Sequence, residues 1–207
     1  MTESGQPLPH VDVSFSDEDW YGNQLTGESY TGGTFTDIDF TEGRTGATVF
    51  RNCTFTRVKF NVSQHVESAF LNCTFKQCNF FQASFVDTKA VGSSFDRCTF
   101  TGMKVRGGDW SLIAAAKSDL RSVDFESVRM NEADLTGVNA EGASFRSVDL
   151  TGAWTANANF RDADLRGATL STIDVTTTTL FGAIIGIEQA IQLATAQGLD
   201  VRADDTT

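Results

Sequence analysis

Apolar residues recur at every fifth position through most of this 207-residue chain. Of the 34 positions in steps of five from Phe15 to Leu180, 31 are apolar, and the exceptions are Thr45, His65 and Thr155. Fifteen of the 17 phenylalanines fall in this one register. A helix repeats about every 3.6 residues and a strand every two, so neither fits a period of five. The period therefore predicts a repeat architecture.

A second column lies two residues before each of these central positions and holds small or β-branched side chains. Thr48, Val58, Ala83 and Ala163 are examples, and the positions between are mostly polar or glycine. Two inward side chains separated by one outward side chain describe a short extended segment followed by a turn. Turns repeated in one sense wind the chain into a solenoid, with large and small inward residues stacked in separate columns.

Four segments of the C-terminal half come close to a five-residue consensus, A(D/N)LXX. They are "ADLTG" (133–137), "VDLTG" (148–152), "ANFRD" (158–162) and "ADLRG" (163–167). These segments resemble the pentapeptide repeat family, in which four units form one square coil of a β-helix. The resemblance implies an all-β fold, a right-handed quadrilateral parallel β-helix over residues 12–183, preceded by a disordered segment, residues 1–11.

The five-residue pattern stops after Leu180, and helical spacing begins. Apolar residues recur at that spacing through 187–194 and Gly198 ends the pattern, which predicts a short amphipathic helix over 186–197. Residues 184–207 are therefore assigned to a capping and dimerisation segment with a disordered tail, because a solenoid needs its last coil covered. The segment holds more apolar side chains than one cap needs, which predicts an end-to-end twofold dimer. The predicted dimer interface comprises Phe181, Ile184, Ile185, Ile187, Ile191, Leu193, Leu199 and Val201.

Longer stretches narrow the resemblance to one group within the family. "DADLRGATL" (162–170), "GAIIGIEQAIQLATAQGL" (182–199), "SAFLNCTF" (68–75) and "VFRNCTF" (49–55) are similar to the MfpA/Qnr fluoroquinolone-resistance proteins, and most to the MfpA members. The resemblance implies a homodimer through the C-termini that mimics B-DNA and binds DNA gyrase, a type II topoisomerase. It also implies protection against quinolone-type or other gyrase poisons, or, more narrowly, self-immunity of an antibiotic producer.

The net charge of −11 is unevenly distributed: −9 over residues 1–43, +6 over 44–106 and −8 over 107–207. Acidic ends around a basic middle argue against a general nucleic-acid binder, which carries a continuous basic face. The basic segment 44–106 also interrupts the acidic surface of a uniform DNA mimic, which favours contact through the dimer centre, with the N-terminal acids as a second contact. The candidate gyrase-binding surface consists of acids directly before central positions: Asp109, Asp119, Asp124, Asp134, Asp149, Asp164 and Asp174.

Candidate chemistry is sparse. All four cysteines, Cys53, Cys73, Cys78 and Cys98, lie in the small-residue column, where a free cysteine serves as a small apolar side chain. Their spacings do not match zinc motifs, and a cytoplasmic chain disfavours disulfides. His65 lies at a central position, so we expect it to be buried and neutral. With no recognisable catalytic set, phosphate loop or cofactor motif, we expect no enzyme, no cofactor and no metal.

The chain has no apolar run of about 18 residues and no signal-peptide pattern at its start. We therefore expect a cytoplasmic protein that binds neither membranes nor nucleic acid directly. An alternative function is a pentapeptide-repeat interaction scaffold whose partner is not a topoisomerase. Two irregular places stand out: Phe81, which the register turns outward, and the run 105–118, whose weak repeats predict a packing irregularity.

Overall fold

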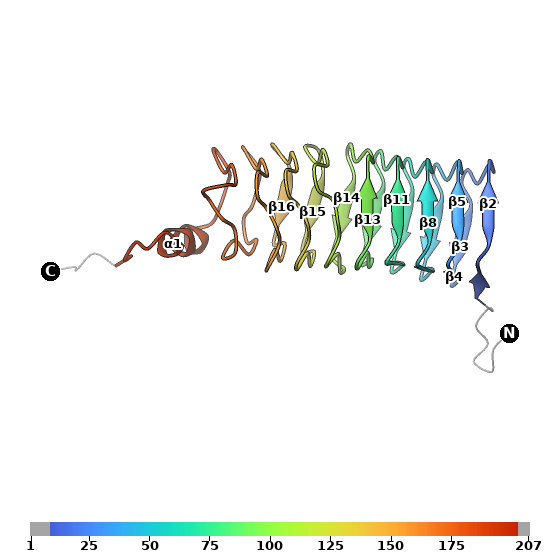
Figure 1. The fold of residues 1–207 in the computed structure, drawn as a ribbon, viewed down its shortest axis with the longest axis horizontal. Coiled ribbons are helices and arrows are strands. Elements are labelled where there is room, and N and C mark those ends of the chain that lie inside the picture. The colour runs from blue at the N-terminus through green and yellow to red at the C-terminus, as the bar shows by residue number, and fades with distance from the viewer. Residues whose placement is uncertain (1–8, 203–207) are drawn as a thin grey trace.

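The computed structural model describes residues 9–202; residues 1–8 and 203–207 lie outside the described ones. The chain forms a rod of stacked coils, and α1 (Ile187–Ala196) lies beyond the last coil (Figure 1). All strand pairs are parallel at an offset of 20 residues, so that Phe35 pairs with Phe15 on one side and with Phe55 on the other. Since 20 residues are four five-residue units, each coil has four faces. The predicted parallel β-helix with a short C-terminal helix is confirmed.

Three of the four faces carry short parallel sheets. Face 1 comprises β1 (His10–Val11), β4 (Ser29–Thr31), β7 (Val49–Arg51) and β10 (Ala69–Leu71). Face 2 comprises β2 (Ser14–Ser16), β5 (Thr34–Thr36), β8 (Thr54–Thr56), β11 (Thr74–Lys76) and β13 (Ser94–Asp96). Face 4 comprises β3 (Gln24–Thr26), β6 (Arg44–Gly46), β9 (Gln64–Val66), β12 (Ser84–Val86), β14 (Lys104–Arg106), β15 (Asp124–Glu126) and β16 (Ser144–Arg146). Face 3 is joined by isolated bridges such as Asp19 with Asp39.

The core is the pair of columns predicted from the repeat. In the N-terminal half the central phenylalanines stack coil upon coil, as Phe55 does between Phe35 at 4.7 Å and Phe75 at 4.9 Å. In the C-terminal half leucine and alanine fill the same columns, for example Leu135 and Ala133, which are fully buried. Every inward residue follows from the period, so the sequence pattern alone determines which side chains form the core.

The C-terminal helix covers the last coil through one polar side chain. Gln189, buried at 6% exposure, donates from Nε2 to the carbonyls of Leu165 and Ala168, both at 2.7 Å. Its Oε1 accepts from the backbone N–H of Gly167 at 3.1 Å and of Gly186 at 2.7 Å. These bonds satisfy backbone groups that the end of a solenoid leaves without a partner coil. The contact between the helix and the last coil is thus centred on a polar residue.

The ladder of backbone hydrogen bonds between coils is interrupted on face 3. Bridges join Asn79 to Thr99 and Asp119 to Asn139, yet within the described chain no backbone hydrogen bond or bridge joins residues 97–102 to residues 116–121. From residue 12 to residue 167, every fifth residue has a positive φ except Ser122, beside this interruption. We call this place the face 3 gap. It overlaps the run 105–118, where the sequence predicted an irregularity.

The first coil begins earlier than the sequence predicted. His10 and Val11 form β1 and pair with Tyr30 and Thr31 of β4, and the His10 ring stacks on Tyr30 at 4.7 Å. The predicted disorder of residues 1–11 is therefore wrong at His10 and Val11, because the neighbouring coil offers them a strand edge. The rest of that segment, residues 1–8, and the end of the predicted tail lie outside the described residues.

Candidate protein-interaction surface

An aspartate directly before a central position first of all holds the turn that follows it. Oδ1 of Asp134 accepts the backbone N–H of Thr136 at 3.0 Å, and Asp149 accepts that of Thr151 at 3.0 Å. Asn139 makes the same kind of bond at its own position. Asparagine and aspartate are therefore interchangeable for the fold, as expected of side chains that mimic a backbone turn. The charge of each aspartate is an addition to this structural role.

Four of the seven predicted surface acids are paired with arginine. The pairs are Asp109–Arg129 at 2.9 Å, Asp119–Arg121 at 2.7 Å, Asp164–Arg166 at 2.6 Å, and Asp124–Arg106. Hydrogen bonds from the arginines hold the pKa values of Asp119 and Asp164 below their usual range. These carboxylates stay charged, but Asp109, Asp119 and Asp164 each have their charge offset by an arginine, whereas Arg106 is shared by Asp124 and Glu126, so that one negative charge remains there. Asp134, Asp149 and Asp174 carry the unpaired negative charge of the set.

The seven acids do not form one patch, because the repeat distributes them around the rod. Asp109 and Asp149 lie two coils apart on face 1, with Arg129 bridged between them. Asp134 on face 2 is bridged to Trp154, and Asp174 follows in the same column. The remaining three are divided between face 3 (Asp119) and face 4 (Asp124 and Asp164). The predicted acidic surface is thus a sparse negative charge on all four faces.

The densest acidic cluster lies at the N-terminal end of the rod, on face 3 and the corners on both sides of it. This acidic tip comprises Asp17, Glu18, Asp19, Asp37, Asp39 and Glu42. Arg57 pairs with Asp37 through Nε at 2.7 Å, and Lys59 pairs with Asp39 at 3.0 Å. The beginning of the basic middle segment therefore neutralises the inner edge of the tip. From the sequence, these acids were predicted to form only a second contact. In the structure they lie closer together than the seven acids of the predicted gyrase-binding surface.

The predicted dimer-interface residues separate into two groups. Ile185 and Leu193 are partly buried and pack against the core, so they belong to the cap. The exposed residues are Phe181 (70%), Ile184 (49%), Ile187 (82%), Ile191 (45%), Leu199 (61%) and Val201 (47%). Six of the thirteen exposed large apolar side chains of the described residues thus belong to the last coil and the segment that follows it. We call this surface the C-terminal apolar end.

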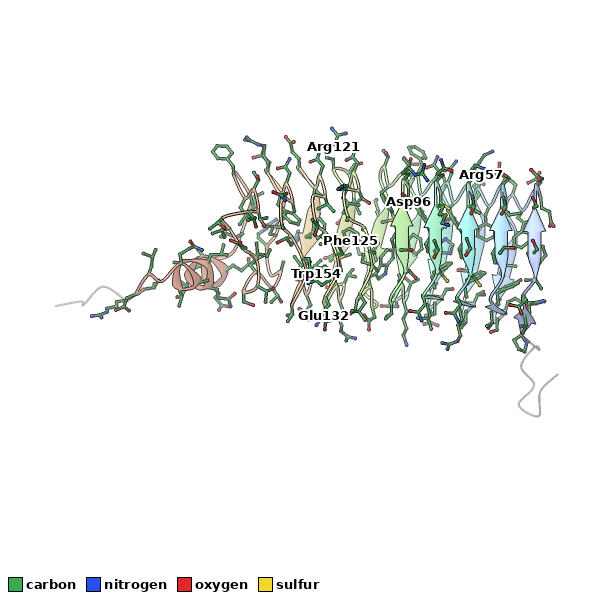
Figure 2. The ribbon with its side chains drawn as sticks, in the orientation of Figure 1. Arg57, Asp96, Arg121, Phe125, Glu132 and Trp154 are labelled. Carbon is green, nitrogen blue, oxygen red and sulfur yellow. The ribbon has the colours of Figure 1, made fainter. Side chains whose placement is uncertain are left out.

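Exposed aromatic side chains also occur along the sides of the rod. Trp154, 64% exposed, stands on face 2 between Asp134 and Asp174, and Arg121 and Glu132 project from opposite sides of the same region (Figure 2). Phe81 is 40% exposed, which confirms that the register turns it outward. Trp154 directly precedes a central residue and Phe81 directly follows one, at positions where the repeat normally places polar side chains. For Phe81, this departure from the pattern was the signal in the sequence.

His65 is the one buried imidazole of the described chain. It hydrogen-bonds Thr45 Oγ1 through Nδ1 at 2.8 Å and Ser63 Oγ through Nε2 at 3.0 Å, and its ring stacks on Phe85 at 4.6 Å. Complete burial lowers the pKa of His65 to about 3. The histidine is thus buried and neutral, as predicted, and the two hydroxyls satisfy its ring nitrogens.

Among residues 9–202, no three histidine, cysteine, aspartate or glutamate side chains lie close enough together to hold a metal ion. In the same range, no helix has both the length and the apolar character needed to span a bilayer. The features that distinguish this surface are therefore its charge distribution and its exposed apolar side chains.

Comparison with known proteins agrees with the repeat and with the fold. The family model of pentapeptide repeats matches residues 118–153 and 143–182, with eight copies of the repeat. The structure of full-length QnrB1, a plasmid-mediated fluoroquinolone resistance protein, matches with a TM-score of 0.64 at 18% identity, covering 93% of this chain and 100% of that one. A trypsin-treated variant of QnrB1 matches with a TM-score of 0.55 at 23% identity, covering 95% and 100%. No curated protein sequence matches. At these identities the solved structures establish the shared fold.

Proposed function

From the premise that this chain is a pentapeptide repeat protein with the fold of QnrB1, we propose that it is a non-catalytic protein that binds DNA gyrase. In this proposal it competes with the DNA of the enzyme and counters quinolone-type or other gyrase poisons. The observation that carries the proposal is the C-terminal apolar end, which closes a negatively charged rod with a surface suited to a second copy. Joined there, two chains make one longer rod.

The charge of such a dimer supports attraction to a basic DNA-binding surface. Residues 107–207 carry −8, so two copies place about −16 around the joint. B-DNA carries about one negative charge per 1.7 Å of its axis, so the rod is a weaker anion than the duplex it replaces. The acidic tips at the far ends add a second negative region on each side. Binding of this kind weakens with added salt, because the charges that drive it are exposed.

A supercoiling assay with cognate gyrase tests the proposal directly. We expect the purified protein, at micromolar concentration, to inhibit supercoiling or to reduce quinolone-stabilised cleavage. Absence of both effects would contradict gyrase binding. Sedimentation of the Ile187→Asp, Ile191→Asp double variant tests the dimer, and we expect a monomer because two charges cannot be buried at the joint without partners. An unchanged mass would exclude the proposed interface.

Asparagine substitutions separate charge from fold in the same assay. Asp134→Asn, Asp149→Asn and Asp174→Asn together remove three unpaired charges and keep the turn hydrogen bond, which asparagine makes at position 139. We expect this triple variant to bind gyrase more weakly, with a shallower dependence on salt. Asp17→Asn, Glu18→Gln and Asp19→Asn are the matched set at the acidic tip. If the tip set alone weakens binding, the contact lies there and the dimer centre is excluded.

The second candidate function is an interaction scaffold whose partner is not a topoisomerase. Arginine pairing of four predicted acids and the spread of all seven over four faces favour it, since neither feature resembles the uniform charge of DNA. Trp154 offers an anchor of the kind that dominates protein interfaces. A pull-down with wild type and with Trp154→Ala distinguishes the two. Recovery of another protein that is lost in Trp154→Ala, with no gyrase subunit present, would support the scaffold.

A further inference from the structure

The face 3 gap opens a surface hollow at the middle of the rod. The hollow has a volume of about 390 Å³, and Cys98, Thr99, Asp119 and Arg121 are among its lining residues. Elsewhere on this face the coils are joined by the hydrogen bonds of Asn79 and its equivalents, which leave no room between them. Water and small solutes therefore reach the small-residue column at this point.

Cys98 differs from the other three cysteines in its access to solvent. All four are free and lie in the same type of column. Cys53 and Cys73 are 0% exposed and Cys78 is 1% exposed, whereas Cys98 is half-buried and lines the hollow. Cys98 also borders the face 3 gap. The equivalent position on the next coil, residue 118, lies on the other side of the gap. The prediction that all four serve as core filling is therefore incomplete at Cys98.

The cysteines form two pairs on adjacent coils, each at an offset of 20 residues: Cys53 with Cys73 on face 2, and Cys78 with Cys98 on face 3. Adjacent parallel strands lie about 4.8 Å apart. A disulfide requires Cα atoms roughly 4.4 to 6.8 Å apart, so a regular coil spacing already fits. Both side chains of each pair point inward from the same face. A disulfide also requires Cβ atoms about 3.5 to 4.5 Å apart, slightly closer than the coil spacing, so joining the sulfurs needs a small local approach of the two coils.

Thiol acidity does not separate the two pairs. The hydrogen bond from Cys78 lowers the pKa of the Cys98 thiol, and burial with the same bond raises the pKa of Cys78. The bond from Cys73 lowers the pKa of Cys53 in the same way. Each pair thus contains one thiol with a lowered pKa beside one with a raised pKa. Since a reactive cysteine also needs access to solvent, the pair at the gap is the one that an oxidant can reach.

We propose that Cys98 is a redox-modification site, reached through the face 3 gap by a hydroperoxide, with Cys78 as its resolving thiol. The Cys98 thiolate attacks one oxygen of hydrogen peroxide, the O–O bond breaks, and sulfenic acid forms while the leaving hydroxide takes up a proton as water. The Cys78 sulfur then attacks the Cys98 sulfur, the S–O bond breaks, and a second water leaves with the thiol proton. Two thiols lose two electrons to one peroxide, which becomes two waters.

Peptide mapping of the folded protein tests this proposal with an internal control. Lysines and arginines separate the four cysteines, so each falls in its own tryptic peptide: 52–57, 60–76, 77–89 and 98–104. The protein is treated with hydrogen peroxide under native conditions, free thiols are then alkylated, and the peptides are quantified by mass spectrometry. We expect a Cys78–Cys98 crosslink to form at least about tenfold faster than any change at Cys53 or Cys73, because the latter need the coil to open first.

Three variants test the order of the steps. In Cys78→Ser we expect the Cys98 sulfenic acid to persist and to be trapped by dimedone. In Cys98→Ser we expect no modification of Cys78, and in Cys53→Ser we expect the wild-type result. Circular dichroism checks that each variant retains the fold. Equal reaction of all four cysteines, no reaction at Cys98, or a wild-type protein that stops at sulfenic acid would each overturn the proposal.

Discussion

The two halves of the rod share one backbone and differ in their cores. Up to Phe100 the central positions are mostly phenylalanine, stacked in continuous ladders, whereas beyond Trp110 leucine, methionine and alanine predominate. The strand register is the same in both, as the pairing of β12 with β14 and of β15 with β16 demonstrates. The coil is therefore set by the five-residue turn, and the central residue only has to be apolar. The family model matches the second half alone, where leucine follows the consensus.

The junction of the two halves explains where the coil is irregular. Trp110, from face 1, leans over the smaller Ala115 and stacks on Phe95 with ring centroids 6.0 Å apart. The Phe95 ladder on face 2 ends there, because Ala115 occupies the next position of that column. The face 3 gap lies in the same pair of coils. A change in core size from one coil to the next thus coincides with the loss of hydrogen bonds between them.

The largest expected effect is at the phenylalanine ladder. Phe55→Ala removes a buried ring and two stacking contacts, so we expect a loss of about 3 to 5 kcal/mol in unfolding free energy. Phe55→Leu places at this central position the residue that is common in the second half. We expect it to lower the unfolding free energy by less than about 1.5 kcal/mol, because the coil backbone accepts either residue. Denaturant unfolding of both variants measures this. If Leu135→Ala lowers the unfolding free energy more than Phe55→Ala does, the phenylalanine ladder does not contribute more to stability than the leucine core.

The next effect concerns the end of the second half. Gln189→Leu leaves the carbonyls of Leu165 and Ala168 buried without donors, and we expect a cost of about 2 to 3 kcal/mol. Hydrogen exchange of the last coil should increase while that of the first half stays unchanged, because each coil contacts only its neighbours. Gln192→Leu, on the exposed side of α1, is the matched control with an expected change below about 0.5 kcal/mol. Equal effects of the two substitutions would exclude a capping role.

A third effect arises from the histidine in the first half. Above pH 6.5, the ordinary pKa of histidine, the imidazole of His65 is neutral in the folded and the unfolded chain. Below pH 6.5 the unfolded chain binds a proton at this residue, whereas the folded chain does not bind it until about pH 3. Stability is therefore full above pH 6.5 and lost as the pH falls through this window. We expect wild type to lose about 2 kcal/mol more than His65→Phe between pH 7 and pH 5.

The control variant His65→Phe removes the imidazole while the neighbouring hydroxyls keep other hydrogen-bond partners. In His65→Phe, Ser63 keeps its hydrogen bond to the Phe60 carbonyl at 2.7 Å, and Thr45 keeps Ser68 at 2.9 Å. The new ring continues the ladder onto Phe85. The difference in pH dependence between the two proteins therefore reports the imidazole alone, and parallel stability curves would show that His65 is protonated at an ordinary pKa in the fold.

The period of five predicted a solenoid, its inward columns and the buried His65, because each is a local property repeated along the chain, whereas the four-faced coil was implied by the family resemblance. Counting residues in steps of 20 also assigns each surface position to a face of the coil. Residues 109 and 149 differ by two coils and 119 belongs to another face, so the spread of the predicted acids was computable once the coil length was known. Their pairing with Arg121 or Arg166 was harder to predict, because rotamers of long side chains decide it.

The contact of Gln189 with the last coil and the face 3 gap could not be predicted from the sequence pattern, for two different reasons. Gln189 looks like an ordinary polar residue of a helix, and only the position of α1 against the last coil gives its amide four backbone partners. The gap depends on how two neighbouring coils with different cores fit, which is a tertiary property. Weak repeats at 105–118 indicated the region, but the missing hydrogen bonds begin at Arg97, within regular repeats.

The smallest expected effect tests whether the turn, common to both halves, limits stability. Val62 has φ of 57°, a conformation unfavourable for a β-branched residue, and its side chain is 40% exposed. We expect Val62→Gly to stabilise the protein by about 0.5 to 1 kcal/mol, since relief of strain exceeds the entropy cost of glycine. Gly142, at φ of 69° on the equivalent corner of the second half, has free space for a Cβ, so Gly142→Val should destabilise by a similar amount. Thermal unfolding of the two variants measures both changes. If only the change at Val62 alters stability, the halves differ in their turns as well as in their cores, and the shared backbone would not be equally strained along the rod.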